Sequence, residues 1–380
     1  MLKRIILPVV VLGFLLLNTS SFGQGNTTSS ITGEVKTKSG AQLIGAAIVA
    51  VHTPSGTKYG TIAREDGHFD LSGLRIGGPY TITVSYSGYA SDKVSDVYLQ
   101  LGQSYKFKAI LDENTSALSE VIVGAAKSGL NNSQTGAESI IDADQINNLP
   151  TVSRSIADFA RTNPMTSVDG DNVLSVAGNN NRYNSIFIDG AVNNDVFGLA
   201  ASGTNGGQTG GSPISLDAID QIQLVVAPYD VTIGGFAGGG INAVTRSGTN
   251  KTEASVYSLT RNQGLAGRTP TDNTSVTPEK LANFSANTFG ARVGGAITKD
   301  KLFYFVSIET QRQTTPQPFN FADYTGTSSA SQIDAFRSKL KNDYNYDAGG
   351  YLDNPDELNS NKVFIRFDYN MSEKHKLMVR

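Results

Sequence analysis

The residue types that most often carry chemistry are few and scattered in this chain. The histidines, His52, His68 and His375, lie far apart, and none begins a His-x-x-Glu or His-x-x-x-His pair of the kind that holds zinc. The glycine cluster at residues 234–240 lacks the Lys and Ser or Thr of a phosphate-binding loop, and a strand-like segment follows it. A Gly-x-Ser-x-Gly elbow, which would indicate a hydrolase, is absent from the sequence. We therefore expect no enzyme, no metal site and no cofactor.

Composition narrows the classes of protein further. The chain has no Cys, so disulfide scaffolds, Cys₄-type zinc sites and a lipid anchor on an N-terminal Cys are excluded. A net charge of −3 gives no basic surface for nucleic acid. The length of 380 residues predicts two or three domains, and 40 Gly without Trp favour a turn-rich, mainly β protein.

The first residues have the composition of a secretory signal peptide. Lys3 and Arg4 precede an apolar run from Ile5 to Leu17, and small and polar residues follow near Gly23. The apolar run is shorter than the roughly 20 residues that a membrane-spanning helix needs. We expect residues 1–24 to be a cleaved signal peptide.

Short β-rich runs separated by turn signals extend from Ile31 to Leu111, which predicts a small antiparallel sandwich at residues 25–113. In the run from Tyr80 to Tyr86, apolar and polar residues alternate, so that one face should be buried. Asp66-Gly67 predicts a tight hairpin, and the Gly-Gly-Pro of residues 77–79 predicts a turn before the next strand.

Residues 114–133 read as a linker of small and polar residues around one β-branched apolar peptide. Residues 134–249 then predict a compact α+β domain, with strands interrupted by glycine clusters. One short helix is expected with Ser153 as its N-cap, with Ile156, Phe159 and Ala160 on one face, and with its end near Pro164.

The region from residue 250 to 380 holds half of the Phe and Tyr residues, and three runs within it, residues 290–298, 302–311 and 363–370, alternate with period two. In the run from Val363 to Asn370, one face is apolar and the other is charged. Long and short connections also alternate between the runs. This is typical of an outer-membrane β-barrel, with short periplasmic turns, long extracellular loops and lipid-facing aromatic residues.

Four strands and the start of a fifth can be counted in this region, whereas about 22 would be needed to close a barrel around a separate domain. We therefore expect the chain to be a fragment of a longer protein. The predicted fold class is mixed but mainly β, with a signal peptide, a small sandwich, an α+β domain and the first strands of a transmembrane barrel. The resemblances of residues 64–89 and 185–250 to known families imply that the sandwich is transthyretin-like and that the α+β domain is a plug.

The stretch of residues 64–89 resembles the carboxypeptidase-regulatory-like family, a non-catalytic sandwich. The segments "SIFIDGAVNN", "LDAIDQIQLVVAP" and "GGFAGGGINAVTRSGTN" resemble, in this order, the pieces of a TonB-dependent receptor plug. The whole order is similar to the Oar-like and SusC-like receptors of Bacteroidota. Val226-Ala227-Pro228 departs from the Arg-Gly or Lys-Gly that many plugs carry before the Pro, which favours the Oar-like branch and puts a glycan solute in doubt.

The resemblance implies a site for the periplasmic energy-coupling protein TonB just ahead of the plug. A β-branched peptide in a linker could add as a strand to the edge of a partner's sheet; an ordinary first strand of the plug is the alternative. The matching residues are Leu118, Ser119, Glu120, Val121, Ile122 and Val123.

Two polar or aromatic loops of the plug are candidates for contact with the solute. The predicted solute-facing residues are Asn179, Asn180, Asn181, Arg182 and Tyr183 in the first loop and Asn193, Asn194, Asp195 and Phe197 in the second.

The expected function is energy-coupled transport of a large solute across the outer membrane of a Gram-negative cell, with TonB, lipid, the solute and a surface lipoprotein as expected partners. Two other functions remain open from the sequence. One is a surface adhesin or assembly protein that uses the barrel as an anchor, and the other is a soluble periplasmic binding protein.

Overall fold

The computed structural model describes residues 26–113, 136–151, 154–168, 173–198, 200, 203–228, 233–272, 275, 277–317, 319, 321, 324–352, 354–373 and 375–380. The expected signal peptide and the expected TonB-binding peptide of residues 118–123 lie outside these ranges. The chain divides into two compact units, of which the first comprises Met1–Asn205 with Ile219–Arg246 and the second Gly206–Ala218 with Ser247–Arg380. Among the residues described, no helix combines the length and the apolar character needed to cross a membrane.

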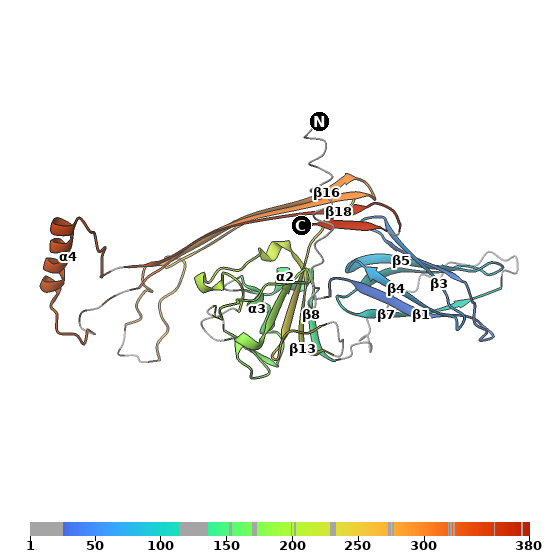
Figure 1. The fold of residues 1–380 in the computed structure, drawn as a ribbon, viewed down its shortest axis with the longest axis horizontal. Helices are drawn as coiled ribbons and strands as arrows, with labels where there is room; N and C mark the ends of the chain where they lie inside the picture. The colour runs from blue at the N-terminus through green and yellow to red at the C-terminus, as the bar shows by residue number, and fades with distance from the viewer. Residues whose placement is uncertain are drawn as a thin grey trace, which may run out of the picture. The chain divides into compact units, whose positions relative to one another are not determined.

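The first unit begins with a sandwich of two sheets (Figure 1). One sheet has the order β4-β1-β7 and the other the order β3-β2-β5-β6. The strand bounds are β1 Ser29–Thr37, β2 Ala47–His52, β3 Thr57–Ile62, β4 His68–Leu74, β5 Gly77–Ser85, β6 Asp92–Leu99 and β7 Ser104–Leu111. Tyr80, Ile82 and Val84 are buried between the sheets, as the alternation predicts.

Three details of this sandwich differ from the sequence predictions. Strand β1 pairs with β7 in parallel, so the sandwich is not wholly antiparallel. Parallel pairing is possible here because β1 and β7 are the first and last strands of the sandwich, so a long stretch of chain connects them. Two strands joined by a tight turn can pair only antiparallel. The turn at Asp66-Gly67 exists, but the strands it joins, β3 and β4, belong to different sheets and form no hairpin. Gly77–Pro79 lies inside β5.

His52 is buried in this sandwich among hydroxyl groups and aromatic rings. Its Nδ1 lies 2.7 Å from Ser55 Oγ, and its ring centroid is 5.0 Å from that of Tyr80. Burial, together with the positive charge of Arg75, lowers the pKa of His52 to about 3. His52 is therefore neutral in the folded sandwich at neutral and mildly acidic pH.

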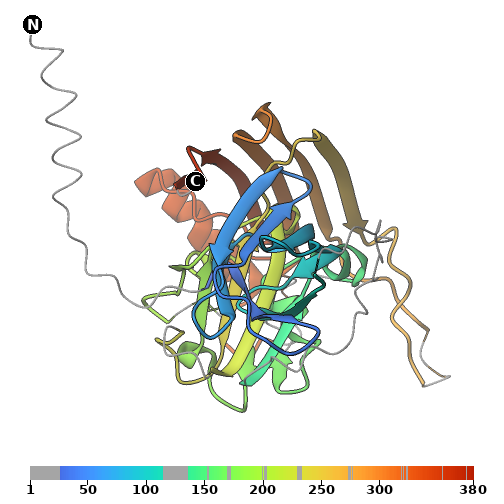
Figure 2. The same cartoon turned by 90° about the vertical axis from the view of Figure 1, so that its right-hand side faces the viewer.

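The rest of the first unit is an α+β domain, coloured green to yellow in Figure 2. It is built around a five-stranded sheet of order β12-β11-β14-β13-β8. Its elements are β8 Gly136–Ile141, α2 Ala143–Asn148, α3 Ile156–Ala160, β9 Thr166–Val168, β10 Leu174–Val176, β11 Ser185–Ile188, β12 Ala191–Val192, β13 Ile219–Pro228 and β14 Gly240–Thr245. Strands β11 and β14 run in parallel, and the other neighbours are antiparallel.

Helix α3 confirms the predicted buried face and corrects its ends. Ile156, Phe159 and Ala160 are buried. The N-cap is Ser155, where Ser153 was predicted, and the helix ends at Ala160, before Pro164. Asp158 explains the later start, because its carboxylate reaches back to the backbone N–H of Ser155.

The second unit contains one antiparallel sheet of order β15-β16-β17-β18-β19. The strands are β15 Glu253–Asn262, β16 Ser285–Thr298, β17 Leu302–Thr315, β18 Asp356–Asn370 and β19 Lys376–Val379. This confirms the four predicted strands and the start of a fifth, although β16 and β17 have 14 residues each and exceed the expected 9 to 11. The long connection between β17 and β18 contains helix α4, Ala330–Tyr344, which the sequence analysis left unassigned.

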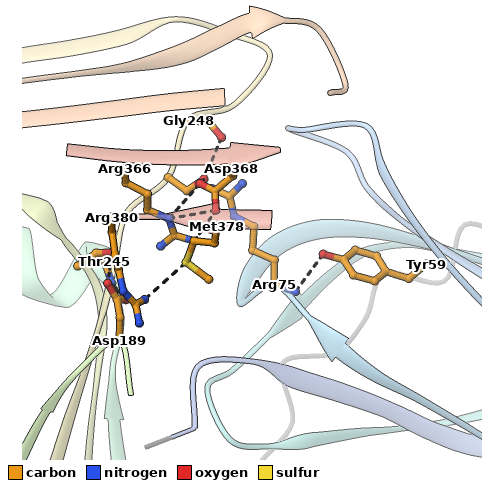
Figure 3. Close-up of polar contacts among 10 residues, drawn as sticks. Tyr59, Arg75, Asp189, Thr245, Gly248, Arg366, Asp368, Met378 and Arg380 are labelled. Atoms are coloured by element: carbon orange, nitrogen blue, oxygen red, sulfur yellow. Dashed lines mark hydrogen bonds and ion pairs between the residues drawn. The ribbon is translucent and has the colours of Figure 1, made fainter. Parts of the chain in front are cut away.

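The two faces of this sheet differ as predicted. One face exposes large apolar side chains, among them Val256, Phe289, Ile297, Ile308, Val363, Ile365, Phe367, Leu377 and Val379. On the other face, Ser307, Glu309 and Arg366 are buried. Arg366 forms an ion pair with Asp368, with Nη2 2.9 Å from Oδ1 (Figure 3).

Acid should destabilise the sandwich through His52. In the unfolded chain His52 takes up a proton near pH 6.5, whereas in the folded state its pKa of about 3 keeps it neutral. The free energy of unfolding should therefore fall by up to about 1.4 kcal/mol for each pH unit between about pH 6.5 and 5. Residues 26–113 have a core of their own, so urea unfolding of this module across that pH range measures the slope. His52→Gln should flatten the slope, and an equal slope in that variant would contradict the assignment.

Candidate functional site

The two loops predicted to face the solute lie together in the first unit. Arg182, between β10 and β11, donates from Nε to the carbonyl oxygen of Gly198 at 3.1 Å. Its neighbour Asn181 donates from Nδ2 to the carbonyl oxygen of Ala200 at 3.2 Å. These contacts bring residues 179–183 and 193–198, separate in sequence, into one tip of the domain.

Asp195 shapes the second loop. Its carboxylate accepts hydrogen bonds from the backbone N–H of Phe197 at 3.0 Å and of Ala200 at 2.5 Å. The N–H of Asp195 donates to the carbonyl oxygen of Gly203 at 2.9 Å. With the turn held in this way, the side chains of Val196 and Phe197 remain 86% and 81% exposed.

The asparagines of this tip serve mainly to fix the backbone. Asn180 Oδ1 accepts from the N–H of Arg182 at 3.1 Å, and Asn194 Oδ1 accepts from the N–H of Ile186 at 2.7 Å. Asn179 Nδ2 donates to the carbonyl oxygen of Val176 at 3.3 Å. The backbone N–H of Asn193 donates to Ile186 O at 2.7 Å.

The surface that the tip presents combines apolar and aromatic side chains with the exposed Asn180 and Arg182. Tyr183 and Val192 are exposed together with Val196 and Phe197. Sequence reasoning chose Tyr183 and Phe197 but missed Val196. The sequence could have indicated Val196, because Val196 and Phe197 are two consecutive apolar residues in an otherwise polar turn.

Asp189, in the Asp-Gly turn of the first plug motif, joins two strands of the same sheet. It is buried with φ +50°, and its carboxylate accepts from the N–H of Thr245 at 2.7 Å and from Thr245 Oγ1 at 2.6 Å (Figure 3). The residue ties the end of β11 to the end of β14. This role is structural, because each carboxylate oxygen accepts a hydrogen bond from within the plug sheet.

In the second unit, a row of residues crosses four strands at one level. Tyr257 pairs with Gly290, Gly290 with Glu309, and Glu309 with Lys362. Because Gly290 has no side chain, Tyr257 lies across it and donates to Glu309 Oε2 at 2.5 Å. Lys362 Nζ lies 2.7 Å from Glu309 Oε1. We call Tyr257, Glu309 and Lys362 the wall cluster.

The segment Gly206–Ala218, which lies within the predicted plug in sequence, packs with the second unit, where it is attached to the wall cluster. Ser215 Oγ donates to Glu309 Oε2 at 3.0 Å. A second attachment joins Asp217 to Arg292, where Nη1 donates to the Asp217 carbonyl oxygen at 3.2 Å. Sequence reasoning missed this site, since Ser215 and Glu309 lie 94 residues apart.

This arrangement can bind and release but offers no covalent chemistry. The buried carboxylate of Glu309 is held by a cation and two hydroxyl groups, so it is neither a free base nor a nucleophile. Among the described residues, no group of His, Cys, Asp and Glu is arranged to hold a metal ion.

The attachment of Gly206–Ala218 should depend on Gly290. A Cβ at this position would stand 2.2 Å from Tyr257 Cζ, so Gly290→Ala should displace the tyrosine and weaken the wall cluster. Loss of about one hydrogen bond predicts roughly tenfold faster amide exchange at residues 215–218. Hydrogen exchange with mass spectrometry on the full-length protein measures this. Gly267→Ala, at a position with open space around it, is the matched control, and equal exchange in the two variants would contradict the prediction.

Comparisons with known proteins agree with the order of these domains. Three family models match in sequence: the carboxypeptidase regulatory-like domain at residues 30–112, the TonB-dependent receptor plug domain at residues 131–241, and the outer membrane beta barrel domain at residues 244–325. The TonB-dependent transporter Oar of Myxococcus xanthus is 26% identical over 352 residues, which cover 89% of this chain and 31% of that protein. The chain thus spans less than a third of the length of this relative.

Solved structures of outer-membrane transporters are also similar. The transporter YddB from Escherichia coli matches with a TM-score of 0.42 and 18% identity, over 62% of this chain and 31% of that chain. A ferric enterobactin receptor mutant from Pseudomonas aeruginosa, PfeA in complex with enterobactin, matches with a TM-score of 0.41 and 15% identity, over 63% of this chain and 31% of that chain. The three domain models match in the predicted order and the similarity to Oar runs through nearly the whole chain, which confirms the resemblance to TonB-dependent receptors that the sequence predicted.

Proposed function

We propose that the chain is part of an energy-coupled transporter of the outer membrane, in which the plug domain gates the passage of a large solute. The observation that carries this proposal is the two-sided sheet of β15–β19. Its apolar face suits hydrocarbon, while its other face carries the buried polar wall cluster. In a lipid-facing barrel, every backbone group is paired and the side chains sort by face.

The solute contacts the plug at the tip formed by residues 179–183 and 193–198. Its amide side chains fix the loops and its apolar side chains are exposed, which favours a solute with an apolar surface over a purely polar one. A barrel wide enough to enclose a plug would pass large solutes once the plug rearranges. Transport would involve no covalent step.

TonB is the proposed source of energy, through the peptide Leu118–Val123. A β-branched peptide of this kind can pair with a partner's sheet edge, where backbone hydrogen bonds supply affinity. The protein would be exported through its N-terminal signal peptide and inserted in outer-membrane lipid. A surface lipoprotein that covers the barrel is a further proposed partner.

A charge on the apolar face should destabilise the barrel in lipid. Val363 is 66% exposed on this face, and Val363→Arg should cost about 2–4 kcal/mol if the position lies near the middle of the bilayer. Urea unfolding of the full-length protein in phospholipid vesicles measures the cost. Leu265→Arg, at an equally exposed position in the connection between β15 and β16, should cost little. A lipid-facing role for the sheet would be refuted if both variants unfolded like the parent protein.

Deletion of residues 118–123 should abolish binding of the periplasmic domain of TonB to the membrane-embedded protein, measured by co-purification. Deletion of residues 128–133, a mostly polar stretch of the same length within the linker, should leave binding intact. Retained TonB binding after the first deletion would contradict the assignment of the peptide. It would also favour the alternative of an adhesin anchored by its barrel.

A further inference from the structure

The sandwich and the plug meet through a short turn of the sandwich, within the first unit. The turn of residues 101–103 lies between β6 and β7, and its partners are on strands β13 and β8 of the plug sheet. The backbone N–H of Leu101 donates to Gln221 Oε1 at 3.0 Å. Gly102 lies so close to the plug that a Cβ on it would be 2.8 Å from Gln223 Nε2.

Glu138 is the centre of this contact. Its Oε1 accepts from Gln103 Nε2 of the sandwich at 3.3 Å, and its Oε2 accepts from Gln223 Nε2 of the plug at 2.9 Å. One carboxylate therefore connects the sandwich turn, strand β8 and strand β13. We call Gln103, Glu138 and Gln223 the amide clamp.

The surroundings of the amide clamp suit a contact that can open. Its apolar part is small, with Ile76 and Leu101 of the sandwich packed against Val244 of the plug. Two buried amide oxygens, Gln103 Oε1 and Gln223 Oε1, accept no hydrogen bond from any described residue. Buried groups left unpaired cost free energy that water recovers on separation, so the docked state is only modestly favoured.

The position of the amide clamp in the chain allows it to resist a pull on strand β8. Gln103 immediately precedes β7, the last strand of the sandwich, and Glu138 lies in β8, the first strand of the plug. Strand β8 is at the edge of its sheet and pairs only with β13 among the described strands. A pull on the residues ahead of β8 would break its ladder from one end, one pair at a time, unless side-chain contacts near that end resist.

We propose that the N-terminal sandwich is a clamp on plug strand β8, which it braces through Glu138 and releases when it detaches from the plug. The proposal rests on the proposed function in one respect, because the coupling peptide lies in the residues that join β7 to β8. Docked, the sandwich keeps β8 on β13. Detached, it leaves β8 held by contacts within the plug: its backbone ladder with β13, the bond from Gln223 to Glu138, and the bond from Asn163 Nδ2 to Ser139 Oγ.

Docking can be tested with introduced thiols, since the native chain has no cysteine. Gly77→Cys with Asp220→Cys, a pair outside the amide clamp, should be joined by a short bismaleimide in the full-length protein, because a Cβ at Gly77 would lie 4.0 Å from Asp220 Oδ2. Adding Gly102→Ala should lower the rate of joining roughly tenfold, because the new methyl group displaces Gln223, which is almost fully buried. Gly73→Ala is the matched control: its φ of +71° resembles the +69° of Gly102, but nothing lies near its Cβ. Failure of the thiols to join in the otherwise unchanged protein would overturn the proposal.

Bracing is tested by hydrogen exchange at the amides of β8. Gly102→Ala should raise exchange at residues 137–141 roughly tenfold, while Gly73→Ala should leave it unchanged. Gln103→Leu should act like Gly102→Ala, since it removes the donor to Glu138 but keeps the backbone bonds of Gln103 with Ser29 and Ser30. Unchanged exchange in β8 with both Gly102→Ala and Gln103→Leu would overturn the clamp. Neither readout requires transport or TonB, so this result is distinct from a failure of the proposed function.

Discussion

The backbone pairing along the β15–β19 sheet, which has one irregularity between Ala296 and Thr298, is the constraint on which the second unit depends. In hydrocarbon no water can pair with a free N–H or C=O, so strands must bond to each other along their whole length. Once that pairing is fixed, the period of two sends each side chain to one face or the other. Lys362 and Val363 are neighbours in sequence, yet the side chain of Lys362 is 11% exposed and lies in an ion pair, whereas Val363 is exposed on the apolar face.

This constraint also determines what the inner face can hold. Side chains directly opposite on neighbouring strands lie close together, so three bulky residues at one level would crowd each other. Gly290 relieves the crowding by giving its space to Tyr257, which can then reach Glu309 two strands away. The result is a polar group, held by the sheet itself, to which Ser215 attaches. The glycine is therefore a condition for the attachment of Gly206–Ala218.

Patterns that repeat along the chain could be predicted from the sequence, and contacts between distant residues could not. The alternation in β16–β18 and the buried face of α3 follow from period and propensity alone. Two contacts could not be predicted in this way: the parallel pairing of β1 with β7 and the hydrogen bond between Ser215 and Glu309. Both depend on which distant segments meet in space, and a local sequence pattern does not indicate this. The asparagines of the plug tip show a third limit, since a polar residue in a loop can face a ligand or hold its own backbone. Asn180 and Asn194 do the latter.

Distant segments in this chain are joined repeatedly by a carboxylate with several donors: Asp189 with Thr245, Glu309 with Ser215, and Glu138 with Gln103 and Gln223. Such a joint is specific in geometry, yet its net contribution is small, because water replaces each lost hydrogen bond when the joint opens. An apolar joint of the same area would resist opening more strongly, since its apolar surface would have to be hydrated. Asp189 differs from Glu138 in being almost fully buried, so water cannot easily replace Thr245 at its carboxylate. Because water reaches Glu138 more easily than Asp189, we expect the hydrogen bonds of Asp189 to hold the plug sheet together and the hydrogen bonds of Glu138 to be the ones that open.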